Sequence, residues 1–257
     1  MEEFVWALKN IDRINPQDCR DWALRNFSLE KVAGMYEEYF QAVLNIHGGQ
    51  GWYEPNPNRT NMDYAVKHYP GRPDPIDYNV LDGEERPMAQ GIARWMKDII
   101  KPKKVLDIGC GPGSYVEELI AEGIDAHGID IDERVEGKDY LSKVSIFDNK
   151  RAADVVTCYE VLEHIDPVFA DQEVDALYNA LEPGGTLIFT AAQPGQGGVG
   201  HINCRKKEYW FNKLTEKGLV YQQDLTGDII QALTTNRYKH DTYMGWFVNN
   251  VMIFKKP

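Results

Sequence analysis

The stretch of this sequence that decides the fold is VLDIGCGPGS, residues 105–114. It opens with a short apolar run that predicts a buried strand, and apolar residues recur at helical spacing from Val116 onward. Gly109, Gly111 and Gly113 lie between these two elements at alternate positions. Glycines placed in this way let the backbone turn tightly and approach a ligand where a Cβ atom would collide. The stretch therefore predicts a strand, a ligand-binding turn and a helix.

The spacing of the glycines distinguishes between cofactors. A dinucleotide fingerprint needs Gly-x-Gly-x-x-Gly, whereas the third glycine here comes one residue early and Ser114 stands where the last glycine should be. This departure argues against a nicotinamide-dependent oxidoreductase. A turn with a purely structural role is the alternative interpretation of the glycines.

From about Pro87 onward, the sequence alternates between strand and helix patterns, which is typical of a parallel sheet covered on both faces. We expect helices around residues 92–99, 116–123 and 174–181. The expected strands span 104–108, 126–131, 144–147, 154–158, 186–191, 220–223 and 247–254. The sequence thus predicts an α/β, Rossmann-like fold with a seven-stranded, mostly parallel sheet and helices on both faces.

Acidic residues that follow the strands carry a family resemblance. Over about residues 85–257 the chain resembles the class I S-adenosylmethionine-dependent methyltransferases, whose first motif is an acidic residue followed by Gly-x-Gly-x-Gly. GIDID at 128–132, ending the second expected strand, and LEPGGTL at 181–187, before the fifth, match the same family. The resemblance implies that the chain binds S-adenosylmethionine.

The resemblance also implies how each end of the cofactor is held. Asp130 would accept both hydroxyl hydrogens of the ribose, Asp107 would lie near the methionine end, and Asp148 would lie at the adenine edge. The implied cofactor-binding residues are Asp107, Gly109, Cys110, Gly111, Gly113, Asp130, Ile131, Asp148 and Tyr159. Asp132 is instead expected to be a solvated helix N-cap.

A second group of chemistry-bearing residues lies in CYEVLEHI, residues 158–165. A helix that begins near Glu160 would place Glu160, Glu163 and His164 on one face. His201 lies in GHIN, residues 200–203, after the fifth expected strand. Oxygen ligands with one or two nitrogens suit Mg²⁺, Mn²⁺ or a similar divalent ion.

This EVLEH segment resembles two metal-dependent groups, the small-RNA terminal-ribose methyltransferases and the ubiquinone-pathway O-methyltransferases. The resemblance implies a metal held by Glu160, Glu163, His164 and His201, which would bind a vicinal diol and lower the pKa of one hydroxyl. Alternatively, His164 or His201 acts as the base. In many class I methyltransferases that need no metal, the second glutamate and the histidine only line the cofactor pocket. The expected catalytic residues are His164, His201 and Glu160.

Two features border this second group. Residues 193–200, QPGQGGVG, are rich in glycine and are expected to form a mobile rim of the acceptor pocket. Arg205-Lys206-Lys207 form a local basic patch beside it. A solvated helix start is the default interpretation of that patch, and contact with an anionic acceptor is the alternative.

The N-terminal part is expected to be a helical extension over residues 1–47, followed by an irregular linker or lid over 48–84 that is rich in Gly, Pro and Asn. The methyltransferase domain is placed at 85–257. Ser28 is the expected N-cap of a helix that Gly48-Gly49 ends. The segments INPQDCRDWA (14–23), NFSLE (26–30) and YEEYF (36–40) resemble the C-terminal helices of two-Rossmann-domain glycosyltransferases. That resemblance implies a carbohydrate acceptor and a glycosyltransferase partner or fusion.

Composition limits the classes of function. Asp and Glu total 40 against 28 for Lys and Arg, so the formal net charge is −12, which repels polyanions and argues against bulk nucleic-acid binding. The first residues, MEEF, lack the basic and apolar regions of a signal peptide, and no apolar stretch reaches the length of a membrane span. We therefore expect a cytoplasmic protein that does not bind membranes. The four cysteines form no CxxC pair, so neither a structural zinc site nor a disulfide framework is expected.

These patterns favour an O-methyltransferase that acts on a hydroxyl of a sugar or glycoconjugate, with or without help from a divalent metal. One alternative is a methyltransferase for ribose, RNA or another small molecule. The other is a non-catalytic module that binds S-adenosylmethionine and interacts with a partner.

Overall fold

The computed structural model describes residues 5, 15–34, 36–37, 78–196, 201–235, 237–238 and 245–257. The chain divides into two compact units, Met1–Pro55 and Asn56–Pro257, and each is described by itself. Residues 48–77 of the expected linker lie outside the described residues. Residues 78–84 were expected to be irregular and are helical instead, so the α/β domain includes residues before the expected boundary at 85.

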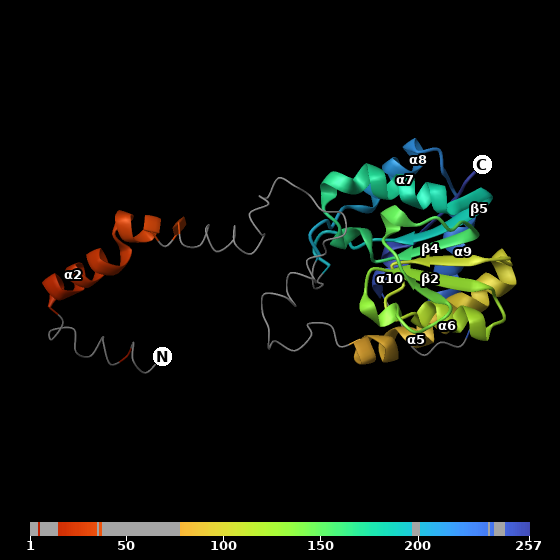
Figure 1. Cartoon of the computed structure of the whole chain (residues 1–257), viewed down its shortest axis with the longest axis horizontal. Coiled ribbons are helices and arrows are strands. Elements are labelled where there is room, and N and C mark those ends of the chain that lie inside the picture. The colour runs from red at the N-terminus through yellow and green to blue at the C-terminus, as the bar shows by residue number, and fades with distance from the viewer. Residues whose placement is uncertain are drawn as a thin grey trace. The chain divides into compact units, whose positions relative to one another are not determined.

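The α/β unit is built on one seven-stranded sheet with the order β3-β2-β1-β4-β5-β7-β6 (Figure 1). Its strands are β1 Val105–Ile108, β2 Ala126–Asp130, β3 Leu141–Lys143, β4 Ala153–Tyr159, β5 Leu181–Thr190, β6 Val220–Tyr221 and β7 Met252–Lys255. The pairs among β1 to β5 are parallel, and β7 runs antiparallel to both β5 and β6. The predicted Rossmann-like sheet is confirmed.

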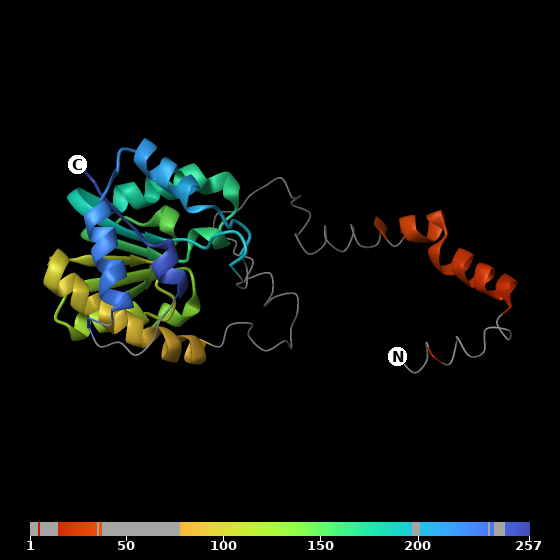
Figure 2. The same ribbon diagram turned by 180° about the vertical axis from the view of Figure 1, so that it is seen from behind.

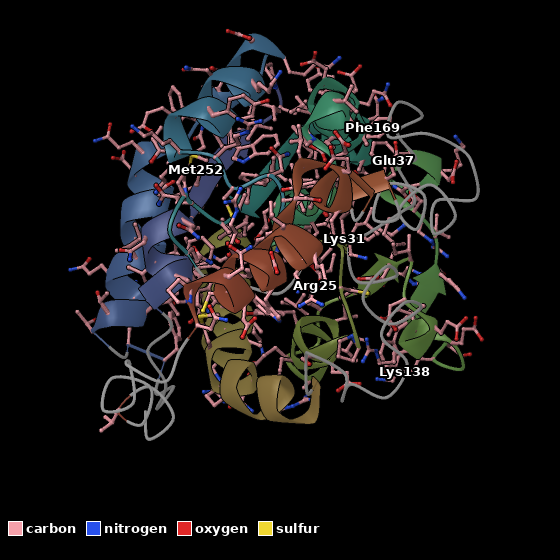
Figure 3. The ribbon with its side chains drawn as sticks, turned by 90° about the vertical axis from the view of Figure 1, so that its left-hand side faces the viewer. Arg25, Lys31, Glu37, Lys138, Phe169 and Met252 are labelled. Atoms are coloured by element: carbon pink, nitrogen blue, oxygen red, sulfur yellow. The ribbon has the colours of Figure 1, made fainter. Side chains whose placement is uncertain are left out.

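Helices cover both faces of the sheet (Figures 1 and 2). One face carries α5 Tyr78–Trp95 with its continuation Met96–Ile100, α6 Ser114–Ala121, α9 Gln223–Thr234 and α10 Gly245–Asn250. The other face carries α7 Ala170–Ala180 and α8 Lys207–Glu216. Phe169 and Met252, labelled in Figure 3, both belong to the core on the α7–α8 side. The sheet is thus buried between two apolar layers, as a near-continuous apolar strand such as β1 requires.

Two expected strands are placed differently by the structure. The strand expected at 144–147 is a short β3 at Leu141–Lys143, followed by a 3-10 turn over Ile146–Asp148 that Ser145 caps by accepting from the amide of Phe147. The strand expected at 247–254 is the helix α10 followed by β7. In both places a run of apolar residues crosses the end of one element and the start of the next, so periodicity alone does not locate the boundary.

The N-terminal unit contains α2, Pro16–Phe27, which begins at a cap on Asn15. The predicted cap at Ser28 is confirmed, because its hydroxyl oxygen accepts from the amide of Lys31 at 3.2 Å and residues 29–34 are helical. Figure 3 labels Arg25 and Lys31 on these two helices. No residue of α2 is buried by the part of the chain that the structure describes. Residues 38–47 of the expected extension lie outside the described residues. Across both units, the described helices include none with the length and apolar character needed to cross a bilayer.

Candidate active site

The glycine turn joins β1 to α6 and depends on backbone angles that favour glycine. The φ angles of Gly109, Gly111 and Gly113 are 74°, 50° and 96°. A Cβ on Gly109 would lie 2.3 Å from Cγ2 of Val161, and one on Gly113 would lie 2.8 Å from Cδ1 of Leu141. The turn is therefore fixed both by its φ angles and by packing against the protein itself. It directs the amino end of α6 towards the carboxyl edge of the sheet, an arrangement that suits binding of a polar ligand.

Asp130 ends β2 beside this turn. Its Oδ2 accepts from the amide of Gly111 at 2.8 Å and its Oδ1 accepts from the amide of Asp132 at 2.9 Å. Each carboxylate oxygen can still accept a further hydrogen bond, so both remain able to receive a ribose hydroxyl. Burial raises the pKa of Asp130, and the two amide donors oppose that rise. Asp132 caps the next turn by accepting from the amide of Arg134, which confirms the expectation that it is an N-cap.

Asp107 is buried in β1 with 2% of its surface exposed. The hydroxyl of Thr157 in β4 donates to its Oδ1 at 2.6 Å. Burial raises the pKa of Asp107 to about 7. Cys110 is also buried, and its Sγ would lie 2.6 Å from a Cβ on Gly128. Burial raises the pKa of the Cys110 thiol, and its side chain packs the turn against Gly128 of β2.

Tyr159 is the last residue of β4. Its ring packs against Tyr115 and Phe247, with ring centroids 5.1 Å and 5.3 Å away. Its hydroxyl is buried and has no hydrogen-bond partner in the part of the chain that the structure describes. Ile131 is half-buried directly after β2, and Asp148 is exposed at the end of the turn that follows β3. An orphaned hydroxyl beside a glycine turn and a β2 carboxylate fits a bound nucleoside cofactor, although the individual roles stay predictions.

Glu160 does not begin a helix, contrary to expectation. Its φ is 52°, in the left-handed region, and its amide donates to the hydroxyl and the carbonyl of Thr190 at 3.0 and 3.2 Å. A 3-10 turn over Leu162–His164 follows. These hydrogen bonds to Thr190 hold the Glu160 backbone against β5, so the chain turns at Glu160 and no helix begins there. The Glu160 carboxylate accepts from Nδ2 of Asn250 at 3.0 Å and from Nε2 of Gln196.

Glu163, His164 and His201 do come together. One ligand atom from each lies within 4.8 Å of the others. The two imidazole centroids are 4.9 Å apart, and Nε2 of His201 lies 4.0 Å from Oε1 of Glu163. The His201 segment is held in place because the amides of Ile202 and Asn203 both donate to the carbonyl of Glu163 at 2.9 Å.

Three of the four predicted metal ligands thus form a cluster of two imidazoles and one carboxyl, and Glu160 lies beside it, next to Glu163, with its carboxylate bonded to Asn250 and Gln196. Oε1 of Glu163 accepts from the amide of Ala192 at 3.1 Å, but its buried Oε2 has no hydrogen-bond partner among the described residues. Burial and the neighbouring charge of Glu160 raise the pKa of Glu163. The donor set fits a divalent ion with nitrogen and oxygen ligands.

Sequence reasoning missed several polar residues here. Sγ of Cys204 lies 3.7 Å from Nδ1 of His201. Gln196 and Asn250 donate to Glu160 and Gln193 donates to Asn250, and the spacing of these residues along the chain does not indicate such a group. In the basic patch, Nε of Arg205 donates to Asn203 at 2.8 Å and its guanidinium stacks on Tyr209, which leaves the choice between solvated patch and anion contact open.

The topology explains why these groups meet. The strand order reverses at β1, which has β2 on one side and β4 on the other. Ligands of open α/β sheets bind at the carboxyl ends of the strands at such a switch point. The glycine turn follows β1, Asp130 is the last residue of β2, and residues 160–164 follow β4. The predicted cofactor-binding residues and the predicted catalytic residues therefore share one edge of the sheet.

Comparison with known proteins agrees with this geometry. A family model described as "Methyltransferase domain" matches residues 82–226, more than half of the chain. The ubiquinone biosynthesis O-methyltransferase of Psychrobacter cryohalolentis is 35% identical over 127 residues, 42% of this chain and 44% of that protein. That of Aromatoleum aromaticum is 32% identical over 128 residues, 42% of this chain and 48% of that protein. The chain thus spans less than half the length of these curated relatives.

Solved structures share the fold. The N-methyltransferase NodS from Bradyrhizobium japonicum WM9, in complex with S-adenosyl-L-homocysteine, covers 79% of this chain and 100% of its own, with 16% identity and a TM-score of 0.51. The plantazolicin methyltransferase BpumL, in complex with the same nucleoside, covers 76% of this chain and 94% of its own, with 13% identity and a TM-score of 0.52. At these identities the likeness concerns the fold.

Proposed function

This chain belongs to the methyltransferase-domain family and has its class I, S-adenosylmethionine-dependent fold, and from this premise we propose that it methylates a hydroxyl oxygen of a small acceptor. The observation that carries the proposal is the meeting of His164, His201 and the buried Glu163 at the carboxyl ends of the central strands. An acceptor hydroxyl loses its proton when its oxygen is methylated, and an imidazole can take that proton.

One group of residues binds the cofactor, and another accepts the proton of the acceptor hydroxyl. When bound, S-adenosylmethionine supplies an electrophilic methyl group on a sulfonium sulfur. The glycine turn and Asp130 hold the nucleoside, and Asp107 lies towards the methionine end. His164 or His201 receives the proton as the acceptor oxygen bonds to the methyl carbon and the electron pair of the broken C–S bond stays on sulfur. Alignment of the acceptor for this in-line displacement is the main contribution of the protein.

Glu163, His164 and His201 would hold a divalent ion if the reaction uses one. Such an ion would polarise the acceptor hydroxyl as a Lewis acid. Without it, the same imidazoles serve as proton acceptors. Both versions predict loss of turnover when either histidine is replaced by alanine, and only the metal-assisted version predicts loss on chelation.

For the acceptor, we favour a sugar or glycoconjugate hydroxyl with a vicinal neighbour. The glycosyltransferase-like segments before residue 41 support this choice and also a glycosyltransferase as partner. A second candidate is an acceptor of the class used in ubiquinone biosynthesis, which the names of the curated relatives favour. RNA is the third, and the net charge of −12 opposes it.

The test is a screen for release of S-adenosylhomocysteine over sugars, phenolic vicinal diols, nucleotides and RNA. Each acceptor is assayed with Mg²⁺, with Mn²⁺ and in excess EDTA. Turnover of a hydroxyl acceptor that is abolished in His164→Ala and His201→Ala supports the proposal. Tight binding of the cofactor with no turnover of any acceptor would instead favour the non-catalytic module.

A further inference from the structure

Two carboxamides donate to the Glu160 carboxylate at the carboxyl edge of β4 and β5, and a third donates to one of these two. We call Gln193, Gln196 and Asn250 the amide clamp. Nδ2 of Asn250 donates to Oε1 of Glu160 at 3.0 Å, and Nε2 of Gln196 donates to its Oε2. Nε2 of Gln193 donates to Oδ1 of Asn250 at 3.0 Å. The clamp thus joins the segment after β5 to the end of α10, both directly and through the Glu160 carboxylate.

Asn250 is the centre of the clamp and has no donor to spare. Its Nδ2 donates to Glu160 and also to Oε1 of Gln196 at 2.8 Å, so both amide hydrogens are engaged. Its own exposure is 2%. A residue this buried and this fully bonded cannot present its amide group to a ligand. Its effect on a ligand must pass through the side chains that it holds.

Glu160, in contrast, keeps capacity for a ligand. It is half-buried, and each carboxylate oxygen that accepts from the clamp can accept one further hydrogen bond. Its left-handed backbone is a conformation that a non-glycine residue adopts at a cost, and such outliers cluster at functional sites. The strained backbone places the carboxylate directly after β4, beside Tyr159 and the switch point of the sheet.

We propose that Glu160 orients the acceptor by accepting a hydrogen bond from one of its hydroxyls, and that Asn250 is the positioning residue that holds Glu160 there. The remaining N–H groups of Gln193 and Gln196 would donate to a neighbouring hydroxyl, so the clamp suits an acceptor with two adjacent hydroxyls. This inference rests on the proposed O-methylation. It gives Glu160 a role other than the metal ligation that its sequence context implied.

Two isosteric variants test the role of the clamp. Asn250→Asp removes both donors and sets a carboxylate against Glu160, and Glu160→Gln removes the acceptor charge. With the hydroxyl acceptor found in the screen, each should raise the acceptor KM about tenfold, since one charge-assisted hydrogen bond is lost or misplaced. Affinity for S-adenosylhomocysteine, measured by calorimetry, should change by less than about twofold. The double variant should cost no more than either single one, because both act on one interaction.

Matched controls separate this role from a general loss of charge or fold. Glu182→Gln and Asn212→Asp make the same chemical changes at exposed positions, and both should leave the acceptor KM unchanged. Gln196→Leu serves if Asn250→Asp fails to fold, because it removes one donor from a half-buried side chain and should raise KM about threefold. An acceptor KM that stays at the wild-type value in Glu160→Gln would overturn the proposal.

A titration with Mn²⁺ alone, followed by electron paramagnetic resonance, tests the competing role. Glu163→Gln should weaken Mn²⁺ binding about tenfold, whereas Glu160→Gln should leave it within about twofold. Equal losses in both variants would make Glu160 a ligand and overturn the proposal. If no acceptor turns over, O-methylation fails and this titration still decides the role of Glu160. Absence of both turnover and Mn²⁺ binding counts against the proposal, because an orienting carboxylate needs an acceptor to orient.

Discussion

The cofactor side and the acceptor side of this site are built in different ways. The cofactor side, which is the glycine turn with Asp107 and Asp130, is joined by the Gly111–Asp130 hydrogen bond between residues 19 apart in sequence. On the acceptor side, Glu160 bonds to Asn250 across 90 residues and Glu163 bonds to Ala192 across 29. The glycine turn and Asp130 therefore follow mainly from local backbone geometry, whereas Asp107, which accepts from Thr157 50 residues away, and the acceptor side depend on the topology of the sheet.

This difference indicates which parts of a methyltransferase fold can change in sequence without loss of the fold. Changes to the glycine turn disturb the backbone that the fold needs, whereas changes at residues 193–196 and 201–204 alter loop side chains at the edge of a rigid sheet. A single fold can thus keep one cofactor and serve many acceptors. The predictions below test whether the cofactor side is as dependent on local geometry as this contrast requires.

The largest effect is expected from Gly109→Ala. The left-handed φ of 74° and the 2.3 Å approach to Val161 add strain and a collision, which together should lower the free energy of unfolding by about 2–5 kcal/mol. Urea denaturation measures this loss. Gly184→Ala is the matched control, because its φ is 75° and a Cβ there would meet none of the described residues within 4 Å. Equal losses at the two positions would show that packing against Val161 does not constrain the turn.

The next effect concerns the pH dependence that Asp107 contributes. Its pKa is raised to about 7 in the folded protein by burial, whereas an unfolded aspartate titrates near 3.8. The native state therefore holds more protons between these values, so the free energy of unfolding falls as pH rises through this window and levels above it. Asp107→Asn should remove about 2–4 kcal/mol of this change.

The measurement is the free energy of unfolding of Asp107→Asn and of the wild type from pH 4 to pH 8. Glu173, whose pKa burial raises to about 8, contributes a similar slope in both proteins and cancels in the difference. Parallel curves for the two proteins would mean that Asp107 is ionised throughout, and the cofactor side would then be less tightly buried than its geometry indicates.

The sequence was sufficient to predict most of the backbone geometry at the glycine turn and Asp130. The glycine spacing, the position of Asp130 and the N-cap role of Asp132 follow from short-range rules, and the structure places all of them at one strand edge. The sheet was also predictable, because an error of a few residues in the ends of a strand or helix does not change the alternation of strands and helices along the chain. The strand expected at 144–147 moved because Ser145 caps a turn there, which is a local hydrogen bond that periodicity does not reveal.

The acceptor side was only partly predictable. The sequence indicated Glu163, His164 and His201, but the expected helix at Glu160 does not form because the Glu160 amide pairs with Thr190 in β5. The clamp at Asn250 could not be foreseen, since the same segment was expected to be a strand. Contacts between residues 54 to 90 apart depend on the order of the strands in the sheet, and no single segment of the sequence determines that order.

Asp130 and Asp132 should differ about tenfold in their effect on the affinity for S-adenosylhomocysteine. Asp130→Ala removes a carboxylate that would receive the ribose hydroxyls and should weaken binding of S-adenosylhomocysteine at least about tenfold, on the order of 1.4 kcal/mol. Calorimetry gives the affinity. Asp132→Ala, two residues away at the cap, should lose about 1 kcal/mol of stability but keep its affinity within about twofold. An unchanged affinity in Asp130→Ala would remove this residue from the cofactor site.

The smallest effect is expected at Asp148, the outermost part of the predicted cofactor side. It ends the 3-10 turn after β3 and is exposed, so a hydrogen bond from the adenine amino group would replace one that the carboxylate already makes with water. Asp148→Ala should therefore weaken binding of S-adenosylhomocysteine only about threefold. An analogue with oxygen in place of the 6-amino group sharpens the measurement. The wild type should prefer the amino form, and the variant should bind both equally. A preference that persists in Asp148→Ala would assign recognition of the adenine edge to the backbone instead, and would extend the contribution of local geometry to that end of the cofactor.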